Sequence, residues 1–339
     1  MSGGSRVTMM TRGGGGRIAT LILLLMLGGP LATLSTVDAR QTDSPAGRIA
    51  FVRGGNVWAW SPNEEARQLF TDGNASDPRW SPDGGEVLYV QRGTSFSNLA
   101  TYDFSSATAI LLTDFEADAE HGSKEYVANS AWVLDPAWSA NGVIVYVSDK
   151  ESEDGALRLW LMPTWESAGG LAPTDETDAG DIEDASVDAN ATVVVYTVLA
   201  LGGSQGGGTY VAIRDLLSGA TFPLVEGPRG AFDPALSSDG QSIVVSIRDE
   251  TGVTDLWMVD RATGSKTQLT QGQQAVAATW SPDAAWIAYL RPGDGGFEAW
   301  AMPVDRATRS AGEPVRLFHY GDLDATSGLS WTYSQIPLP

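Results

Sequence analysis

The stretch DPRWSPDGGEVLYV, residues 77–90, places a Trp, a Ser-Pro-Asp-Gly turn and an apolar run side by side. Related stretches recur at 135–149, 184–198, 233–247 and 277–291, and GLSWTYS lies at 328–334. The position of Trp80, the Trp column, is then filled by Trp138, Val187, Leu236, Trp280 and Trp331. These positions define a repeat of about 50 residues, and a repeat of this length is typical of a fold built from similar structural units.

Each repeat carries four β-strand signals separated by turns. The first strand ends at the Trp column, and Pro82, Asp83 and Gly84 then supply a tight turn. An apolar run follows, and two further strands complete the unit, for example NLATYDF at 98–104 and TAILLTD at 108–114. Helix signals are few, so we predict an all-β fold of six blades, each with four antiparallel strands.

The two ends of the repeat region complement each other. Residues 47–71 contain the second, third and fourth strands of a blade without a first strand, and GLSWTYS is a first strand without successors. We therefore expect the C-terminal strand to join the N-terminal blade and close the ring, which removes two exposed sheet edges. The predicted propeller domain covers residues 40–339.

The first 39 residues differ from the rest of the chain. Three Arg precede an apolar run broken by Gly-Gly-Pro, and Val37 and Ala39 are small residues suited to a cleavage site. We expect residues 1–39 to be a signal peptide, with an uncleaved membrane anchor as the alternative. Export places the protein in the periplasm, the cell envelope or the extracellular space.

The composition excludes several kinds of chemistry. The chain has 339 residues, a formal net charge of −21 and no Cys, so disulfides, thiolate nucleophiles and Cys-ligated metals are ruled out. Loss of residues 1–39 would make it more acidic. An acidic chain repels phosphate backbones, so we expect no nucleic-acid partner and membrane contact only through an uncleaved N-terminal segment.

The WSPDG-plus-strand repeat resembles that of TolB-type β-propellers, which also occur in propellers attached to prolyl oligopeptidase-type peptidases. The resemblance runs from about 47 to 334 and is most specific at Trp80–Gly84 and Trp280–Asp283. TolB carries an α/β domain before its propeller and the peptidases carry a hydrolase domain after theirs. Neither has a counterpart here, so we expect the propeller alone and transfer neither function.

Catalytic signals are sparse, and we predict that the protein is not an enzyme. We expect no nucleophile elbow, and only His121 and His319 are available as bases. The Gly-rich segment at 201–210 precedes a strand, so we interpret it as a strand connection and not as a phosphate loop. Four Asp precede the Trp-bearing strands, and their repetition favours a structural role in capping backbone: Asp77, Asp135, Asp184 and Asp233. A carbohydrate-active enzyme using carboxylates at the central opening remains the alternative.

Insertions depart from the repeat and therefore carry more functional information. Four segments exceed the basic unit, at 114–134, 148–156, 173–183 and 198–208, and strand parity places all four on one face. Three are acidic and predict a docking surface for a protein or peptide, with a basic partner favoured. The predicted partner-binding residues are Asp114, Glu116, Asp118, Glu120, Asp175, Glu176, Asp178, Asp181 and Glu183.

These features together predict an exported, monomeric, non-catalytic binding module. It would present rigid loops on one face and admit a chain end to a central opening. We expect no cofactor. A weak Ca²⁺ site in the acidic loops is the less favoured alternative, because the sequence lacks a D-x-D-x-D-G calcium loop.

Overall fold

The computed structural model describes residues 45–152, 155–163, 180–200 and 208–338. The chain divides into two compact units, Met1–Gln41 and Thr42–Pro339, and every described residue belongs to the second. The predicted signal peptide, residues 1–39, lies outside the described residues. Within the described ranges, no helix has the length and apolarity needed to cross a membrane.

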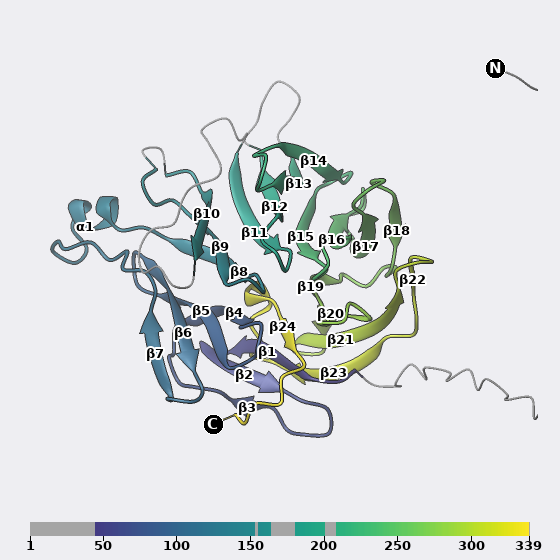
Figure 1. Ribbon diagram of the computed structural model, residues 1–339, viewed down its shortest axis with the longest axis horizontal. Helices are drawn as coiled ribbons and strands as arrows, with labels where there is room; N and C mark the ends of the chain where they lie inside the picture. The colour runs from purple at the N-terminus through teal and green to yellow at the C-terminus, as the bar shows by residue number, and fades with distance from the viewer. Residues whose placement is uncertain (1–44, 153–154, 164–179, 201–207, 339) are drawn as a thin grey trace, which may run out of the picture. The chain divides into compact units, whose positions relative to one another are not determined.

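The fold is a six-bladed β-propeller, as predicted, with antiparallel sheets arranged in a ring (Figure 1). In blade 1 the strands run β24(Ser330–Thr332), β1(Arg48–Arg53), β2(Asn56–Trp60) and β3(Arg67–Gln68). Blade 2 contains β4(Ala75–Trp80), β5(Glu86–Arg92), β6(Ser97–Asp103) and β7(Thr108–Leu111). Blade 3 contains β8(Val133–Trp138), β9(Val143–Ser148) and β10(Arg158–Pro163), and its expected fourth strand near residue 170 lies outside the described residues.

The second half of the ring follows the same order. Blade 4 contains β11(Asp181–Val187), β12(Val193–Leu199), β13(Thr209–Asp215) and β14(Thr221–Glu226). Blade 5 contains β15(Ala231–Leu236), β16(Ser242–Arg248), β17(Thr254–Asp260) and β18(Lys266–Gln268). Blade 6 contains β19(Val276–Trp280), β20(Trp286–Gly293) and β21(Gly296–Asp305). The end of β21 pairs with the short β22(Ser310–Ala311), and β23(Val315–Tyr320) pairs along its middle as the expected fourth strand.

The core consists of six apolar clusters, one between each pair of neighbouring blades. Successive side chains of a strand point to opposite faces, so the second strand of each blade feeds two clusters. In β5, Val87 and Tyr89 join the cluster shared with blade 1, while Leu88 and Val90 join the one shared with blade 3. Burial on both faces explains why these strands are continuous apolar runs.

The ring closes through the C-terminal strand, as predicted. β24 pairs with β1, with Trp331 opposite Ile49 and Ser330 opposite Ala50, and Figure 1 shows yellow β24 beside purple β1. Trp331 is buried, and its indole Nε1 donates to the Ala46 carbonyl at 2.8 Å. The two ends of the propeller are therefore held by the same sheet.

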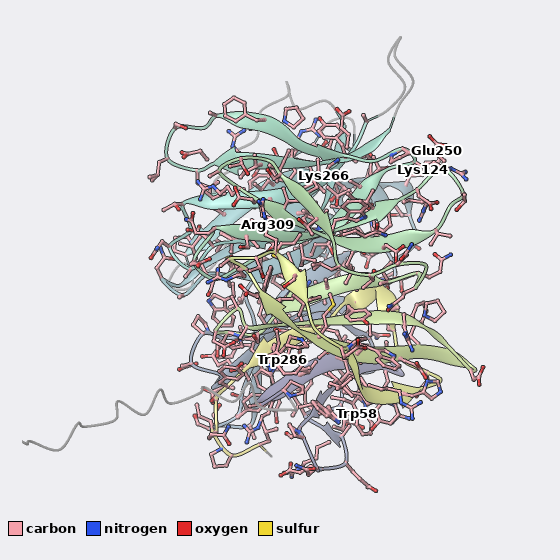
Figure 2. The ribbon with its side chains drawn as sticks, turned by 90° about the vertical axis from the view of Figure 1, so that its right-hand side faces the viewer. Trp58, Lys124, Glu250, Lys266, Trp286 and Arg309 are labelled. Atoms are coloured by element: carbon pink, nitrogen blue, oxygen red, sulfur yellow. The ribbon has the colours of Figure 1, made fainter. Side chains whose placement is uncertain are left out.

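Aromatic side chains fill the space between blades. Trp286 is buried in the cluster between blades 6 and 1, and Trp58 from the third-strand position of blade 1 packs against the same cluster. Figure 2 shows both residues in this lower part of the ring. Trp160, in the third strand of blade 3, is likewise buried, in the cluster between blades 2 and 3.

Candidate functional site: the axial channel

A β-bulge interrupts the first strand of blades 2 to 6 just before the Trp column. Each bulge contains a residue with positive φ, a conformation that side chains other than Gly rarely adopt. Blade 1 has Gly328, with φ 65°, at the same place in the repeat. These six residues form the axial column, with φ between 46° and 65°: Asp77, Asp135, Asp184, Asp233, Ala277 and Gly328.

Hydrogen bonds link successive members of the axial column around the channel. The backbone N–H of Asp184 donates to Asp135 Oδ2 at 3.0 Å, and that of Asp233 donates to Asp184 Oδ2 at 3.3 Å. The N–H of Ala277 donates to Asp233 Oδ2 at 3.1 Å. Each of these carboxyl groups therefore caps backbone of the next blade, which is the structural role predicted for the repeated Asp.

Of the four Asp in the axial column, Asp77 is buried and Asp135, Asp184 and Asp233 are half-buried, and the loss of solvent around their carboxyl groups raises their pKa values. Desolvation is the largest cause in every case. It raises the pKa of Asp135 to about 8, with the charges of Asp77 and Asp184 adding to the effect. It raises the pKa of Asp184 to about 7, with Asp233 adding to it. At neutral pH the carboxyl groups of Asp135 and Asp184 can therefore donate as well as accept a hydrogen bond.

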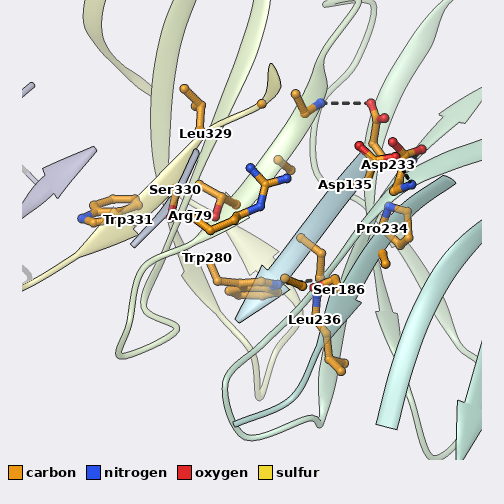
Figure 3. A pocket seen from close by; sticks show the side chains of 18 of the residues that line it. Arg79, Asp135, Ser186, Asp233, Pro234, Leu236, Trp280, Leu329, Ser330 and Trp331 are labelled. Carbon is orange, nitrogen blue, oxygen red and sulfur yellow. Dashed lines mark hydrogen bonds between the residues drawn. The ribbon is translucent and has the colours of Figure 1, made fainter. Parts of the chain in front are cut away.

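Five of the six residues of the axial column, all but Asp77, line a cavity of 1030 Å³ on the propeller axis. At one end the wall is formed by the Trp column and its turns, including Trp80, Trp138 and Trp280. At the other end it is formed by Glu183, Phe232, Phe297 and two cations, Arg229 and Arg248. Figure 3 shows side chains from several blades converging on this space. The lining combines apolar side chains with charged and hydroxyl groups, and a cavity of this size with such groups is typical of a ligand site.

Arg79 is the residue that sequence reasoning missed. Its side chain extends into the cavity, with Leu329 and Ser330 on one side and Asp135 and Asp233 on the other (Figure 3). A signal was present in the repeat, because the residue two places after the axial column is small in the other five blades. Those residues are Ala137, Ser186, Ala235, Thr279 and Ser330.

The first acidic insertion lies away from the channel. It connects β7 to β8 and contains helix α1(Lys124–Asn129), which Figure 1 shows at the outer edge of the ring. We call residues 114–132 the acidic arm. Its buried Tyr126 donates to Glu116 at 2.8 Å. All four predicted partner-binding residues of this segment are solvent-exposed: Asp114, Glu116, Asp118 and Glu120.

The structure places the third acidic insertion differently from the expectation. Asp175, Glu176 and Asp178 lie outside the described residues. Asp181 and Glu183 are not in a loop, because β11 begins at Asp181. Asp181 accepts a hydrogen bond from the Leu157 N–H at 3.0 Å, and Glu183 lines the channel. Burial raises the pKa of Glu183, with Asp181 adding to it.

The expectation that the sequence lacks a nucleophile-elbow pattern was wrong. Residues 202–206, GGSQG, have G-x-S-x-G spacing, although they lie outside the described residues. They connect strand β12 to strand β13, whereas a nucleophile elbow joins a strand to a helix. Neither His belongs to blade 4. His121 contacts Glu116 at 3.5 Å in the acidic arm, and His319 is in β23.

The residues in the part of the chain that the structure describes do not form a metal site. Three or more His, Asp or Glu side chains do not converge there in a group that could hold a metal ion. The axial Asp side chains face backbone amides of the next blade instead of a common point. The carboxyl groups of Asp135, Asp184 and Asp233 therefore contribute to the wall of the cavity and do not converge on a metal ion.

No protein-family model matches the sequence, and no curated protein matches it. Solved structures do match. TolB from Acinetobacter baumannii superposes with a TM-score of 0.63 and 17% identity, over 84% of this chain and 66% of that one. A putative TolB from Agrobacterium tumefaciens gives a TM-score of 0.58 and 15% identity, over 85% and 99%. The chain thus spans about two thirds of the A. baumannii protein.

The same architecture also occurs in an enzyme. An oligogalacturonate lyase in complex with manganese superposes with a TM-score of 0.51 and 12% identity, over 81% of this chain and 74% of that one. Identities at this level establish the fold and leave the function to be argued from the site. The chain is a six-bladed β-propeller with an axial cavity, and its fold is similar to that of TolB.

Proposed function

We propose that the protein is an exported, non-catalytic binding module whose partner is a protein or peptide. The observation that carries this proposal is the state of the channel carboxyl groups. Asp135, Asp184 and Asp233 each accept a backbone N–H of the next blade, so they hold the ring together and do not form a free acid–base pair. The channel then serves as a preformed cavity, 1030 Å³ in volume, which fits a chain end.

The acidic arm supplies the second element of the proposal. Its carboxylates alternate along residues 114–120 with half-buried neighbours, so the acidic side chains share one exposed side. Helix α1 also exposes Val127 to 55% and the following segment exposes Trp132 to 36%. Acidic side chains beside exposed apolar ones complement a basic partner that carries apolar residues. We propose that the partner docks on this arm.

An affinity capture from the envelope and culture fluid of the source cells tests the proposal. The bait is residues 40–339, and one variant changes Asp114, Glu116, Asp118 and Glu120 to Asn or Gln. A matched control variant neutralises four exposed carboxylates elsewhere on the ring, Glu64, Glu65, Glu250 and Glu313. We expect a basic protein on the wild-type and control baits and its loss from the arm variant. Retention of no specific protein by any bait would contradict the proposal.

A carbohydrate-active enzyme is the second candidate, and one observation favours it. The pKa values of about 8 for Asp135 and about 7 for Asp184 suit general acids at neutral pH. Glycoside hydrolysis would need one of them to leave its backbone amide and reach a substrate oxygen. Release of reducing ends from a panel of plant and bacterial polysaccharides, abolished by Asp135→Asn or Asp184→Asn, would establish this candidate and overturn the first.

A further inference from the structure

Arg79 departs from the repeat at a position that faces the propeller axis. It lies two residues after Asp77, and the corresponding residues of the other blades are Ala, Ser or Thr. A structural residue of a repeat should recur with it, as the axial Asp do. A single large cation among five small side chains therefore calls for a local explanation, and the small neighbours leave the space into which it extends (Figure 3).

The guanidinium of Arg79 is only partly engaged. Its Nη1 donates to the Pro78 carbonyl at 2.9 Å and to the Ser327 carbonyl at 3.4 Å. Its Nε and Nη2 donate to none of the described residues, and Arg79 forms no ion pair with them. Since Arg presents a planar set of donors that matches a carboxylate in a bidentate way, the unused donors are suited to bind an anion.

The carboxyl groups of Asp77 and Asp135 interact with the charge of Arg79, which lowers their pKa values, but desolvation is the larger cause for both. Burial raises the pKa of Asp77, and it raises the pKa of Asp135 to about 8. A protonated Asp135 carries no negative charge and instead offers a hydroxyl donor. Because protonated Asp135 does not compensate the positive charge of Arg79, that charge is available to an anionic ligand on this side.

The axial column also leaves one approach to Arg79 free of carboxylates. Ala277 and Gly328 replace Asp in blades 6 and 1. A Cβ placed on Gly328 would have only the Arg79 Nη atoms as neighbours, at 3.9 and 4.0 Å, so this side of the guanidinium is open. The cavity wall on this side is apolar and is formed by Val276, Ala278 and Leu329.

We propose that Arg79 binds the C-terminal carboxylate of a polypeptide segment in the axial channel, with the last side chain of that segment against the apolar wall. This inference rests on the proposed function, because it specifies which chain end the channel admits. A cavity of 1030 Å³ has room for several residues, which favours a chain end over a small carboxylic acid. Protonated Asp135 and Asp184 would donate to backbone carbonyls of the segment.

Two peptide pools test the assignment. Both contain N-acetylated hexapeptides with varied last residues, and they differ only in a free or an amidated C-terminus. They are passed over the immobilised protein, and retained peptides are quantified by mass spectrometry. We expect the free-acid pool to be retained about 10-fold better or more, with apolar last residues enriched, because charge-assisted hydrogen bonds are lost in the amide. Equal retention of both pools would overturn the assignment while leaving channel binding intact.

Variants separate the role of Arg79 from general effects. Arg79→Gln should abolish the preference for the free acid, and Arg79→Lys should retain part of it. Arg316→Gln removes an exposed cation of blade 6 and should leave the preference unchanged. If Arg79→Gln keeps the full preference, the proposal fails. Retention of neither pool by the wild-type protein would count against the channel as a peptide site, and thus against that part of the proposed function too.

A second variant tests the site without removing Arg79. Gly328→Asp restores the carboxylate that this blade lacks, at a φ close to that of the four natural Asp of the column. The new side chain should pair with Arg79 and prevent peptide binding. Because Gly328 has φ 65° and ψ −163°, a conformation that favours Gly, Gly328→Ala is the matched control: it carries the same backbone strain without the carboxylate and should keep the preference for the free acid. Undiminished free-acid binding by the folded Gly328→Asp variant would contradict the site. Equally tight binding of 3-phenylpropionate would show that a small acid, and not a chain end, is the ligand.

Discussion

The two parts of the channel wall share a backbone and differ in chemistry. Blades 2 to 5 carry the axial Asp, and we call these four residues the Asp arc; Ala277 and Gly328 form the bare arc. The positive φ occurs in both arcs, so the bulge belongs to the repeat and does not depend on the carboxyl group. In Asp135, Asp184 and Asp233 the carboxyl group adds a hydrogen bond to the next blade, which Ala277 and Gly328 cannot make.

The bare arc coincides with the place where the ring closes. There the C-terminal strand completes blade 1, and the first strands of blades 6 and 1 carry no axial carboxyl group. The Ser330 hydroxyl accepts the Trp80 N–H at 2.9 Å, and β24 pairs with β1. Axial carboxyl groups thus bond the next blade at Asp135, Asp184 and Asp233, whereas in blade 1 the returning C-terminal strand closes the ring. The bare arc also leaves the carboxylate-free approach to Arg79.

The largest expected effect comes from breaking the closure. Deletion of residues 326–339 removes β24 and exposes the edge of β1, so we expect unfolding at ambient temperature or a melting temperature lower by tens of degrees. Trp331→Ala alone should cost about 3–5 kcal/mol, because it empties a buried aromatic site. Differential scanning calorimetry measures both. An unchanged melting curve after the deletion would contradict closure by the terminal strand.

A smaller effect is expected from the Asp arc. Asp184→Ala leaves the Asp233 N–H and the Thr197 hydroxyl without their acceptor, so we expect a loss of about 2 kcal/mol. Asp184→Asn keeps an acceptor oxygen at the same place and should lose less. Urea denaturation of the two variants gives the comparison. Equal losses would show that hydrogen bonding to the next blade is not what this residue contributes.

The pH dependence distinguishes the arcs further. Asp135 and Asp184 have pKa values near 3.8 when unfolded, and about 8 and about 7 when folded. The folded state therefore binds protons more tightly, and its stability falls as pH rises from about 4 through 8. We expect the free energy of unfolding, measured by urea denaturation, to decrease by several kcal/mol between pH 5 and pH 8.5.

The double variant Asp135→Asn/Asp184→Asn is the control for this dependence, and it should lose much less stability over the same range. The turn residues Asp83, Asp239 and Asp283 have lowered pKa values, so their contribution disappears only as pH falls below about 4. They titrate outside the measured window. A wild-type protein whose stability rises from pH 5 to pH 8.5 would contradict the burial of neutral Asp in the arc.

The sequence predicted the architecture because the repeat is itself a sum of local signals. The Trp column, the turns and the doubly buried second strands are visible as residue types at fixed spacing, and so is the split blade. The bulge was not predictable in this way, because the positive φ of Asp77 or Asp135 is imposed by strands on both sides. Whether a repeated Asp faces water or backbone also depends on the neighbouring blade.

The candidate site was predicted less well, for a related reason. The acidic loops were found because they depart from the repeat in length. Arg79 departs from the repeat in side-chain size at a single position. That this position faces the axis follows only from the bulge, which the sequence does not show. The early start of β11 places Asp181 and Glu183 in a strand instead of a loop, with Glu183 on the channel wall, which residue counting from the turn could not show.

The smallest effect on stability is expected from the acidic arm, which lies outside both arcs. Asp114, Asp118 and Glu120 are exposed, so their change to Asn or Gln should alter the free energy of unfolding by less than about 0.5 kcal/mol. Partner capture should nevertheless be lost. Thermal unfolding measured beside the capture assay tests both statements. A marked loss of stability would show that the arm supports the fold and is not primarily a docking surface.

The most direct test of the account is photocrosslinking from the channel wall. Thr279→p-benzoylphenylalanine places a photoreactive group in the cavity, and Thr263→p-benzoylphenylalanine places one on an exposed outer turn as the control. If the axial channel binds the C-terminal segment of a partner, irradiation in the source cells should crosslink position 279 to the C-terminal peptide of one protein. Position 263 should not form this crosslink. Crosslinks to saccharide alone, or to the same proteins from both positions, would contradict binding of a C-terminal segment in the channel.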